Sequence, residues 1–406
     1  MTQKTVFFTS ITPNYLAKAR ILCKSLKEYN PSAFFVLGLC DSQTIDKKFL
    51  EDPFDAVLDF NSLESIKDKQ SFLFKHTITE LCTAVKPFYA EAIINDYHAD
   101  NVIYLDPDIG VFESLEPLTA YLDDYSIILT PHQLAPEKDD LYVRENEILF
   151  LKRGSFNLGF FGMKSDSQGL DFLHWWQNRL LFYCFDDDYE VLPELASDNL
   201  LGLFTDQKWI DLVPCLFSNH YIIRDPGYNV CTWNLSNRHI QLSSNGTYSV
   251  NGYPLRFFHF SGYDSGGHHN ELIKSIQHYP FNHDALQLSN WYEERLKKEN
   301  QEYFGNISYS LTKYENGEVI QNFERKIYHI RKDVYNIFQN PYKVTSSEPC
   351  FYHWIRNEYA EYFDESKYLA RRKEDLSAAA MLNRWFPRGS VRRTIVSFLA
   401  NKMFSR

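Results

Sequence analysis

The sequence lacks several features that would each point to a particular class of protein. Its seven cysteines are scattered and form no Cys-X-X-Cys pair, which argues against a disulfide framework or a zinc site and favours reduced thiols. No stretch approaches the roughly 20 apolar residues that a membrane-spanning helix needs. The first ten residues do not have the pattern of a secretory signal peptide. We therefore expect a cytoplasmic protein.

A surplus of basic residues is also missing. The formal net charge is -11 over 406 residues, which argues against general nucleic-acid binding, because phosphate contacts need Lys and Arg. The chain has no internal repeat or low-complexity tract, and its 27 Tyr and 32 Phe argue against disorder over most of its length. A chain of this length with 44% hydrophobic residues can build one large domain or two smaller ones.

Apolar runs alternate with helical patterns along the first two thirds of the chain. This alternation predicts an α/β domain over residues 1–275, with a mainly parallel sheet flanked by helices. Charged helical patterns then predict a mostly helical C-terminal region over residues 276–406. The predicted strands are residues 4–10, 33–40, 55–60, 101–106, 125–130, 155–164, 220–225 and 255–260.

Two aspartates, Asp106 and Asp108, follow one of these predicted strands, at the end where α/β sheets bind their ligands. In a turn opened by Pro107, both carboxylates can converge on one divalent cation. Hard oxygen ligands suit Mg²⁺ or Mn²⁺, which leave positions open for substrate phosphates. Asp-Pro-Asp is also ordinary turn chemistry after a strand. The pair alone therefore leaves both interpretations open.

A histidine, His259, ends a later predicted strand. It stands between two phenylalanines, where a histidine is often only a satisfied core group. However, Gly262 follows it, and glycine allows a close approach of the backbone to another group. Imidazole is compatible with Mn²⁺. We expect Asp106, Asp108 and His259 to form one half of an octahedral site, with a diphosphate and water on the other half.

These segments resemble a known family. YLDPDIGVF (104–112) resembles the D-x-D motif of nucleotide-sugar glycosyltransferases of the GT-A fold. Together with HFSG (259–262), it is similar to glycosyltransferase family 8, the retaining family that includes glycogenin and bacterial lipooligosaccharide galactosyltransferases. Residues 10–26, FNLGFFG (156–162) and TDQKWID (205–211) resemble further segments of that family in the same order. The likeness consists of short islands and indicates a related but distinct bacterial family.

The resemblance implies a role for each matched residue. The implied metal ligands are Asp106, Asp108 and His259. The implied contacts to the nucleoside and the donor are Thr9, Ser10, Tyr15, Lys86, Asp106 and Gly262, with Lys86 where family members carry an arginine. The implied residues at the reacting sugar are Asn157 and Asp206, which hold hydroxyls, and Gln207, below the anomeric carbon.

Two positions depart from the family pattern. Lys208 stands where the family has a third acidic residue, in its DQD segment. YDSGGHH (263–269) replaces the lysine-containing segment that usually follows HFSG. The lysine that contacts the diphosphate is therefore missing from its usual place, and His268 and His269 are candidates to replace it.

The implied reaction moves a sugar from a nucleotide-diphosphate donor, with a UDP-sugar favoured, to a glycan or lipid-linked glycan acceptor. Besides Asp206 and Gln207, no motif places a nucleophile beneath the sugar, so we expect retention through attack from the leaving-group side. An inverting enzyme would need a carboxylate base on the far face, and Glu194, Asp198 and Asp264 are unassigned acids. The residues also leave open a sugar nucleotidyltransferase and a non-catalytic sugar- or partner-binding protein.

The C-terminal tail, residues 381–406, holds six basic residues and no acid. Val391, Ile395, Phe398 and Leu399 share one face of a predicted helix. A basic amphipathic helix suits an anionic membrane surface, but the same pattern fits packing on the acidic body or on a partner. The membrane interpretation predicts peripheral contact at the inner face of the cell membrane, consistent with the synthesis of bacterial surface polysaccharide or lipopolysaccharide.

Overall fold

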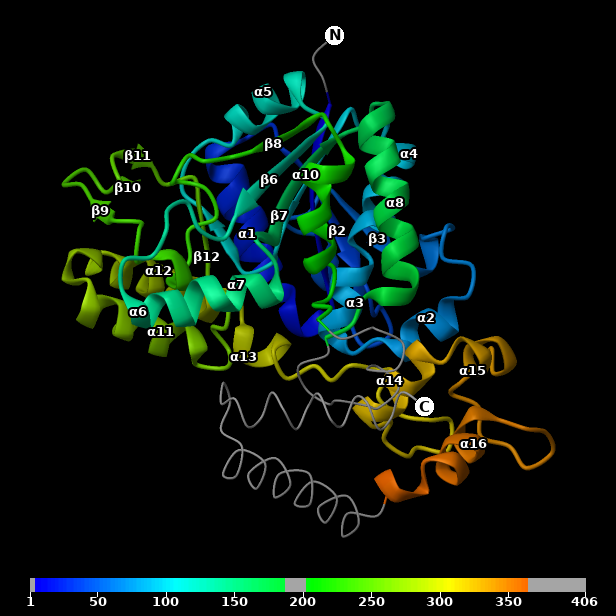
Figure 1. Ribbon diagram of the computed structural model, residues 1–406. Helices are drawn as coiled ribbons and strands as arrows, with labels where there is room; N and C mark the ends of the chain where they lie inside the picture. The colour runs from blue at the N-terminus through cyan, green and yellow to red at the C-terminus, as the bar shows by residue number, and fades with distance from the viewer. Residues whose placement is uncertain (1–3, 187–201, 364–406) are drawn as a thin grey trace, which may run out of the picture. The chain divides into compact units, whose positions relative to one another are not determined.

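The computed structural model describes residues 4–186 and 202–363. A seven-stranded sheet lies at its centre, in the order β3-β2-β1-β4-β7-β6-β8 (Figure 1). Only β7 runs antiparallel to its neighbours β4 and β6, and all other pairs are parallel. The predicted α/β class with a mainly parallel sheet is confirmed. The strands are β1 (Thr5–Ile11), β2 (Phe34–Leu39), β3 (Ala56–Asp59), β4 (Asn101–Leu105), β6 (Ile127–Pro131), β7 (Phe156–Lys164) and β8 (His220–Ile222).

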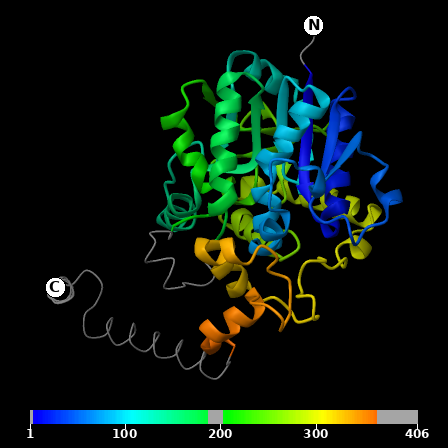
Figure 2. The same ribbon diagram turned by 90° about the vertical axis from the view of Figure 1, so that its right-hand side faces the viewer.

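Helices cover both faces of this sheet (Figures 1 and 2). Helices α1 (Leu16–Tyr29) and α5 (Glu116–Asp124) pack on one face, and α4 (Lys86–Tyr97) and α8 (Ser167–Tyr183) pack on the other. Successive side chains of a strand point to opposite faces, so Val6 and Phe8 of β1 enter one core while Phe7 enters the other. Burial on both faces explains why β2, FFVLGL, reads as an almost continuous apolar run.

Local signals define the start of the helices that border the site. Helix α3 (Ile78–Ala84) begins with a capping box, in which the Glu80 carboxylate accepts from the Thr77 amide at 2.8 Å. Helix α4 begins after Val85, and its second residue is Pro87. Proline has no amide hydrogen, which is harmless here because amides in the first turn have no acceptor within the helix. Lys86, the first residue of α4, is thereby placed with its ammonium 4.5 Å from the ring centre of Tyr104 in β4.

A second ladder lies outside the main sheet. Strand β5 (Ile109–Val111), directly after the Asp-Pro-Asp turn, pairs antiparallel with β12 (Phe257–His259). A three-stranded sheet consists of β9 (Ile240–Leu242), β10 (Tyr248–Val250) and β11 (Tyr253–Pro254). Thus the predicted strand 255–260 forms, but it pairs with β5 rather than joining the central sheet.

After β12 the described chain is helical, as the sequence predicts. Residues up to Gln339 belong to one compact unit and those from Asn340 to a second. The domain boundary between residues 275 and 276 stays a prediction. The tail 381–406 lies outside the described residues. The later helices are α11 (Gly267–His278), α12 (Ala285–Lys298), α13 (Gln301–Phe304), α14 (Asn322–Ile330), α15 (Lys332–Ile337) and α16 (Phe351–Glu358), and the shorter ones before them are α2 (Lys69–Lys75), α6 (Asp140–Tyr142), α7 (Ile148–Arg153) and α10 (Val213–Leu216).

The sequence argues against disulfide bonds and against membrane-spanning helices. All seven cysteines are free thiols, six of them buried or half-buried. In the parts of the chain that the structure describes, no helix combines the length and the apolar character needed to cross a membrane.

Candidate active site

The small β5–β12 ladder brings His259 to the aspartate pair. Its register sets His259 opposite Ile109, and the Phe260 amide donates to the Asp108 carbonyl at 2.8 Å. His259 Nε2 consequently lies 3.0 Å from Asp108 Oδ1 and 3.7 Å from Asp106 Oδ2. One ligand atom from each of the three side chains lies within 4.8 Å of the other two. The three predicted metal ligands, which come from distant parts of the sequence, therefore share one site.

The Asp-Pro-Asp turn is held against β7. The Asp106 amide donates to the Gly159 carbonyl at 2.8 Å, and the Tyr104 hydroxyl donates to Asp106 Oδ1 at 2.7 Å. Gly159 has no room for a side chain, because a Cβ there would lie 2.6 Å from His259 Cε1 and 2.7 Å from Asn157 Oδ1. The glycine of the FNLG segment thus allows β7 to approach the imidazole closely.

The imidazole of His259 and the neighbouring carboxylates influence each other's pKa. Burial alone would raise the pKa of Asp108, but the charges of His259 and Lys18 outweigh it and lower that pKa to about 2. Burial would likewise lower the pKa of His259, but the neighbouring carboxylates outweigh it and raise that pKa. A proton on the imidazole and a metal ion would compete for the same site, because a ligating imidazole is neutral. The two carboxylates suit either Mn²⁺ or Mg²⁺, and the imidazole suits Mn²⁺ better than Mg²⁺.

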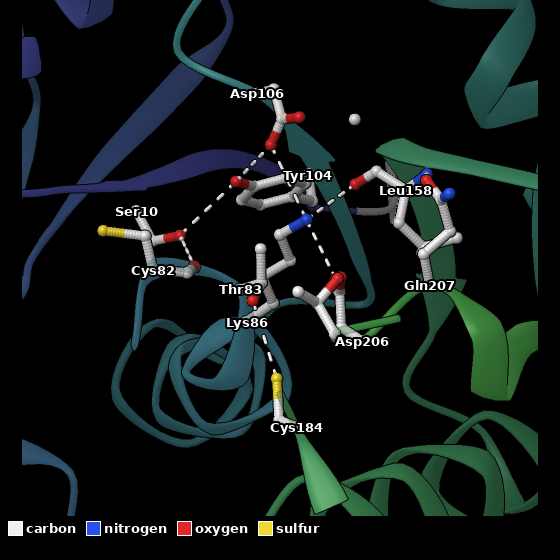
Figure 3. A network of polar contacts seen from close by, with 12 residues as sticks. Ser10, Cys82, Thr83, Lys86, Tyr104, Asp106, Leu158, Cys184, Asp206 and Gln207 are labelled. Atoms are coloured by element: carbon white, nitrogen blue, oxygen red, sulfur yellow. Dashed lines mark hydrogen bonds and ion pairs between the residues drawn. The ribbon is translucent and has the colours of Figure 1, made fainter. Parts of the chain in front are cut away.

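Lys86 links this cluster to a further predicted site residue (Figure 3). Its ammonium lies 2.9 Å from Asp206 Oδ2, donates to the Leu158 carbonyl at 2.8 Å, and lies 3.6 Å from Asp106 Oδ1. The Lys86 and Asp206 side chains are each only 2% exposed. Burial would lower the pKa of Lys86, but Asp106 and Asp206 outweigh it and raise that pKa. Lys86 is therefore a buried cation between two carboxylates.

The amides of Asn157 and Gln207 are both buried and held by protein groups. Asn157 Oδ1 accepts from the Gly159 amide and from Asn229 Nδ2, both at 3.0 Å. Gln207 Oε1 accepts from the Leu158 amide at 3.2 Å, and its Nε2 donates to the Arg153 carbonyl at 3.0 Å. These hydrogen bonds fix the orientation of both amides.

Two cavities meet at this cluster, and both are lined by Asp106, His259 and Ser261. The larger has a volume of about 560 Å³, and the smaller has a volume of about 210 Å³. Predicted site residues lining the larger cavity are Lys86, Asp106, Asn157, Asp206, Gln207 and His259. Those lining the smaller cavity are Ser10, Tyr15, Asp106, Asp108 and His259. Asp106, His259 and Ser261 therefore lie at the boundary between the two cavities.

Four candidates do not line these two cavities. Thr9 is buried in β1, next to Ser10 but on the other side of the strand. Gly262 forms a turn with φ +72°, and its carbonyl accepts from the His268 amide at 3.1 Å. His268 packs among aromatic rings, and burial lowers its pKa to about 4. His269 is exposed.

Lys18 lies beside Tyr15 and influences Asp108 by its charge, although it lines neither cavity and was not among the predicted site residues. Its ammonium lies 3.9 Å from the ring centre of Tyr15 and forms an ion pair with Asp264. The available signal was its spacing from Tyr15, because residues three apart in a helix lie on the same face. The ion pair with Lys18 occupies the carboxylate of Asp264, one of the three acids to which the sequence analysis assigned no role. The other two, Glu194 and Asp198, lie outside the described residues.

Two bacterial proteins are similar to this chain in sequence, and no family model matches it. The chain is 29% identical over 191 residues to YfnF and 23% identical over 260 residues to YfnD, two proteins of Bacillus subtilis (strain 168) described as uncharacterized. The matches cover 46% and 63% of this chain, and 57% and 77% of YfnF and YfnD. The chain thus spans a little over half the length of YfnF.

Solved structures similar to this chain include glycosyltransferases. The galactosyltransferase LgtC in complex with donor and acceptor sugar analogs is 15% identical with a TM-score of 0.41, covering 67% of this chain and 95% of LgtC. Mouse xyloside xylosyltransferase 1 is 13% identical with a TM-score of 0.34, covering 64% and 97%. The glycosyltransferase GlyE of Streptococcus pneumoniae TIGR4 is 14% identical with a TM-score of 0.34, covering 57% and 48%. TM-scores this low do not support a functional assignment, so the function is inferred from the residues of the site.

Proposed function

We propose that this protein is a metal-dependent glycosyltransferase of the GT-A type. It transfers a sugar, with retention, from a nucleotide-diphosphate donor, a UDP-sugar being favoured, to a glycan or lipid-linked glycan. The observation that carries the proposal is the convergence of Asp106, Asp108 and His259 between two cavities. The motif resemblance supports it independently of the geometry.

Each cavity has a use in this reaction. The smaller one receives the nucleoside, with the half-buried Tyr15 ring packing on the base and Ser10 beneath it. The larger one receives the donor sugar and the acceptor. Asp106, Asp108 and His259 would hold Mn²⁺ or Mg²⁺, which neutralises the charge that develops on the departing diphosphate. The diphosphate therefore spans the point where the two cavities meet.

The remaining residues orient the sugar. Asp206 would bind its hydroxyls, with Asn157 beside it in the cavity lining, and Lys86 holds the Asp206 carboxylate in place. Gln207 is a poor nucleophile because it is an amide, and Asp206 is already paired with a cation. Attack from the leaving-group side, with the departing phosphate accepting the proton of the acceptor, therefore fits this chain better than a covalent intermediate. Observation of the product's anomeric configuration by NMR separates retention from inversion.

The setting of the reaction extends the proposal. A lipid-linked acceptor would place the enzyme at the inner face of the cell membrane, with residues 381–406 as the contact. This fits the synthesis of bacterial surface polysaccharide or lipopolysaccharide.

The direct test measures nucleotide release from a panel of UDP- and GDP-sugars with Mn²⁺, with and without EDTA. We expect release with at least one donor, its loss in EDTA, and its loss in Asp108→Asn. Nucleotide binding without release, for any donor and acceptor, would instead favour a non-catalytic binding protein. Pyrophosphate formation from a nucleoside triphosphate and a sugar 1-phosphate would favour a nucleotidyltransferase.

A further inference from the structure

One wall of the larger cavity is basic, and the proposed reaction does not use it. Lys75 ends α2, and helix α14 contributes Arg325, Lys326 and His329. We call these four residues the α14 wall. Helices α2 and α14 pack against each other near the same end of the central sheet (Figures 1 and 2).

The positive charges of the α14 wall have no carboxylate partners among residues 4–186 and 202–363. Lys75 donates to the Leu181 carbonyl and Lys326 to the Asp186 carbonyl. Arg325 Nη1 donates to the Phe74 carbonyl at 2.6 Å. Lys75 is only 2% exposed and Arg325 only 4%. Buried cations normally have a counter-ion, because desolvation is costly. Burial lowers the pKa of Lys75 to about 7, so the spare positive charge of the wall comes mainly from Arg325 and Lys326.

The wall also contains a buried imidazole, that of His329. His329 is 4% exposed, and within the described chain neither of its ring nitrogens makes a hydrogen bond of good geometry, its polar contact being with the backbone of Lys75. Burial, together with the charges of His76 and Lys75, lowers the pKa of His329. Its neutral ring can therefore donate one hydrogen bond to a ligand.

Among the described residues, two acids near the wall, Glu80 and Asp68, are already engaged. Glu80 accepts from the Thr77 amide at 2.8 Å and from the Asp186 amide at 2.9 Å. Asp68 accepts from the Ser71 hydroxyl at 2.6 Å and from the Ser71 amide at 3.1 Å. Within the described residues, the charge of Arg325 and Lys326 thus has no carboxylate partner and is available to a ligand in the cavity.

We propose that the α14 wall binds an anionic group, a carboxylate or a phosphate, on the acceptor sugar. The inference rests on the proposed function, which assigns the cavity's metal end to the donor. An anion at the wall would supply the missing counter-charge through charge-assisted hydrogen bonds, which are about twice as strong as neutral ones. The substrate class is therefore an acidic or phosphorylated saccharide.

The test measures binding of glucuronate, glucose 6-phosphate and glucose by calorimetry, with saturating UDP and Mn²⁺ and again without them. We expect each charged probe to bind at least tenfold more tightly than glucose. Lys326→Gln should reduce that preference about tenfold, and Lys326→Glu should abolish it. Lys332→Gln, an exposed lysine on α15 whose ammonium bonds the Tyr183 hydroxyl, is the matched control and should keep the preference.

Each contrary outcome overturns the inference in its own way. Equal affinity for charged and neutral probes, or no binding of any probe, would show that the wall does not select anions. A preference for UDP-glucuronate over UDP-glucose, without any preference among the free sugars, would show that the recognised anionic group is on the donor sugar and not on the acceptor. Failure of UDP to bind with Mn²⁺ would count against the proposed function instead, and the measurement without UDP would still report on the wall.

Discussion

Replacing Lys86 by methionine tests the central electrostatic arrangement of the site. Methionine keeps much of the side-chain length but removes the charge, and so leaves the Asp206 carboxylate buried without its ion pair at 2.9 Å. Removing one partner of a buried pair costs about 3–5 kcal/mol, and the lost hydrogen bond to the Leu158 carbonyl adds about 1 kcal/mol. We expect the free energy of unfolding to fall by about 4–6 kcal/mol in total.

A double variant distinguishes this cause from a general packing defect. Lys86→Met combined with Asp206→Leu removes both charges, and replacing a whole buried pair by apolar groups is often nearly neutral for stability. The double variant should therefore regain most of the lost stability, although nucleotide release stays abolished because both side chains belong to the proposed site.

The assay is urea denaturation followed by circular dichroism in EDTA, so that bound metal does not contribute to stability. Lys24→Met is the matched control, because Lys24 forms a 2.6 Å ion pair with Glu299 but is 45% exposed. It should lose no more than about 1 kcal/mol. A loss below about 1 kcal/mol in Lys86→Met, or a double variant less stable than the single one, would refute the reasoning.

Three further predictions concern the same site. Asp108→Asn should weaken Mn²⁺ binding by at least tenfold, measured by calorimetry, because it removes a charged ligand; unchanged affinity would exclude Asp108 as a ligand. Gly159→Ala should cost about 1–3 kcal/mol in urea denaturation, because the new Cβ overlaps His259 at 2.6 Å, and should also weaken Mn²⁺ binding; wild-type values for both would contradict the close approach. Tyr15→Ala should raise the KM for the donor about tenfold or more, given roughly 1–3 kcal/mol for stacking of a base on an aromatic ring, whereas Tyr15→Phe should not; equal effects in both variants would count against stacking.

Much of the fold follows from local patterns in the sequence. The apolar runs that became β1, β2, β4 and β7 are buried on both faces, and such strands are recognisable without knowledge of their partners. Asp106 and Asp108 could be singled out because they directly follow such a run. Ser10 and Thr9 could not be separated in advance, since adjacent strand residues face opposite ways and only the packing decides which face meets the cavity.

Tertiary structure decided which of these groups meet. The sequence by itself determined the α/β class, the strand that ends in Asp106 and the presence of a histidine at the end of a later strand. Only the antiparallel register of β12 on β5 brought His259 to Asp108, and only the folded chain paired Lys86 with Asp206 and set α14 beside α2. The physical reason is that helix and strand patterns depend on neighbours a few residues away, whereas contacts between distant segments depend on how the buried faces of the whole chain pack together.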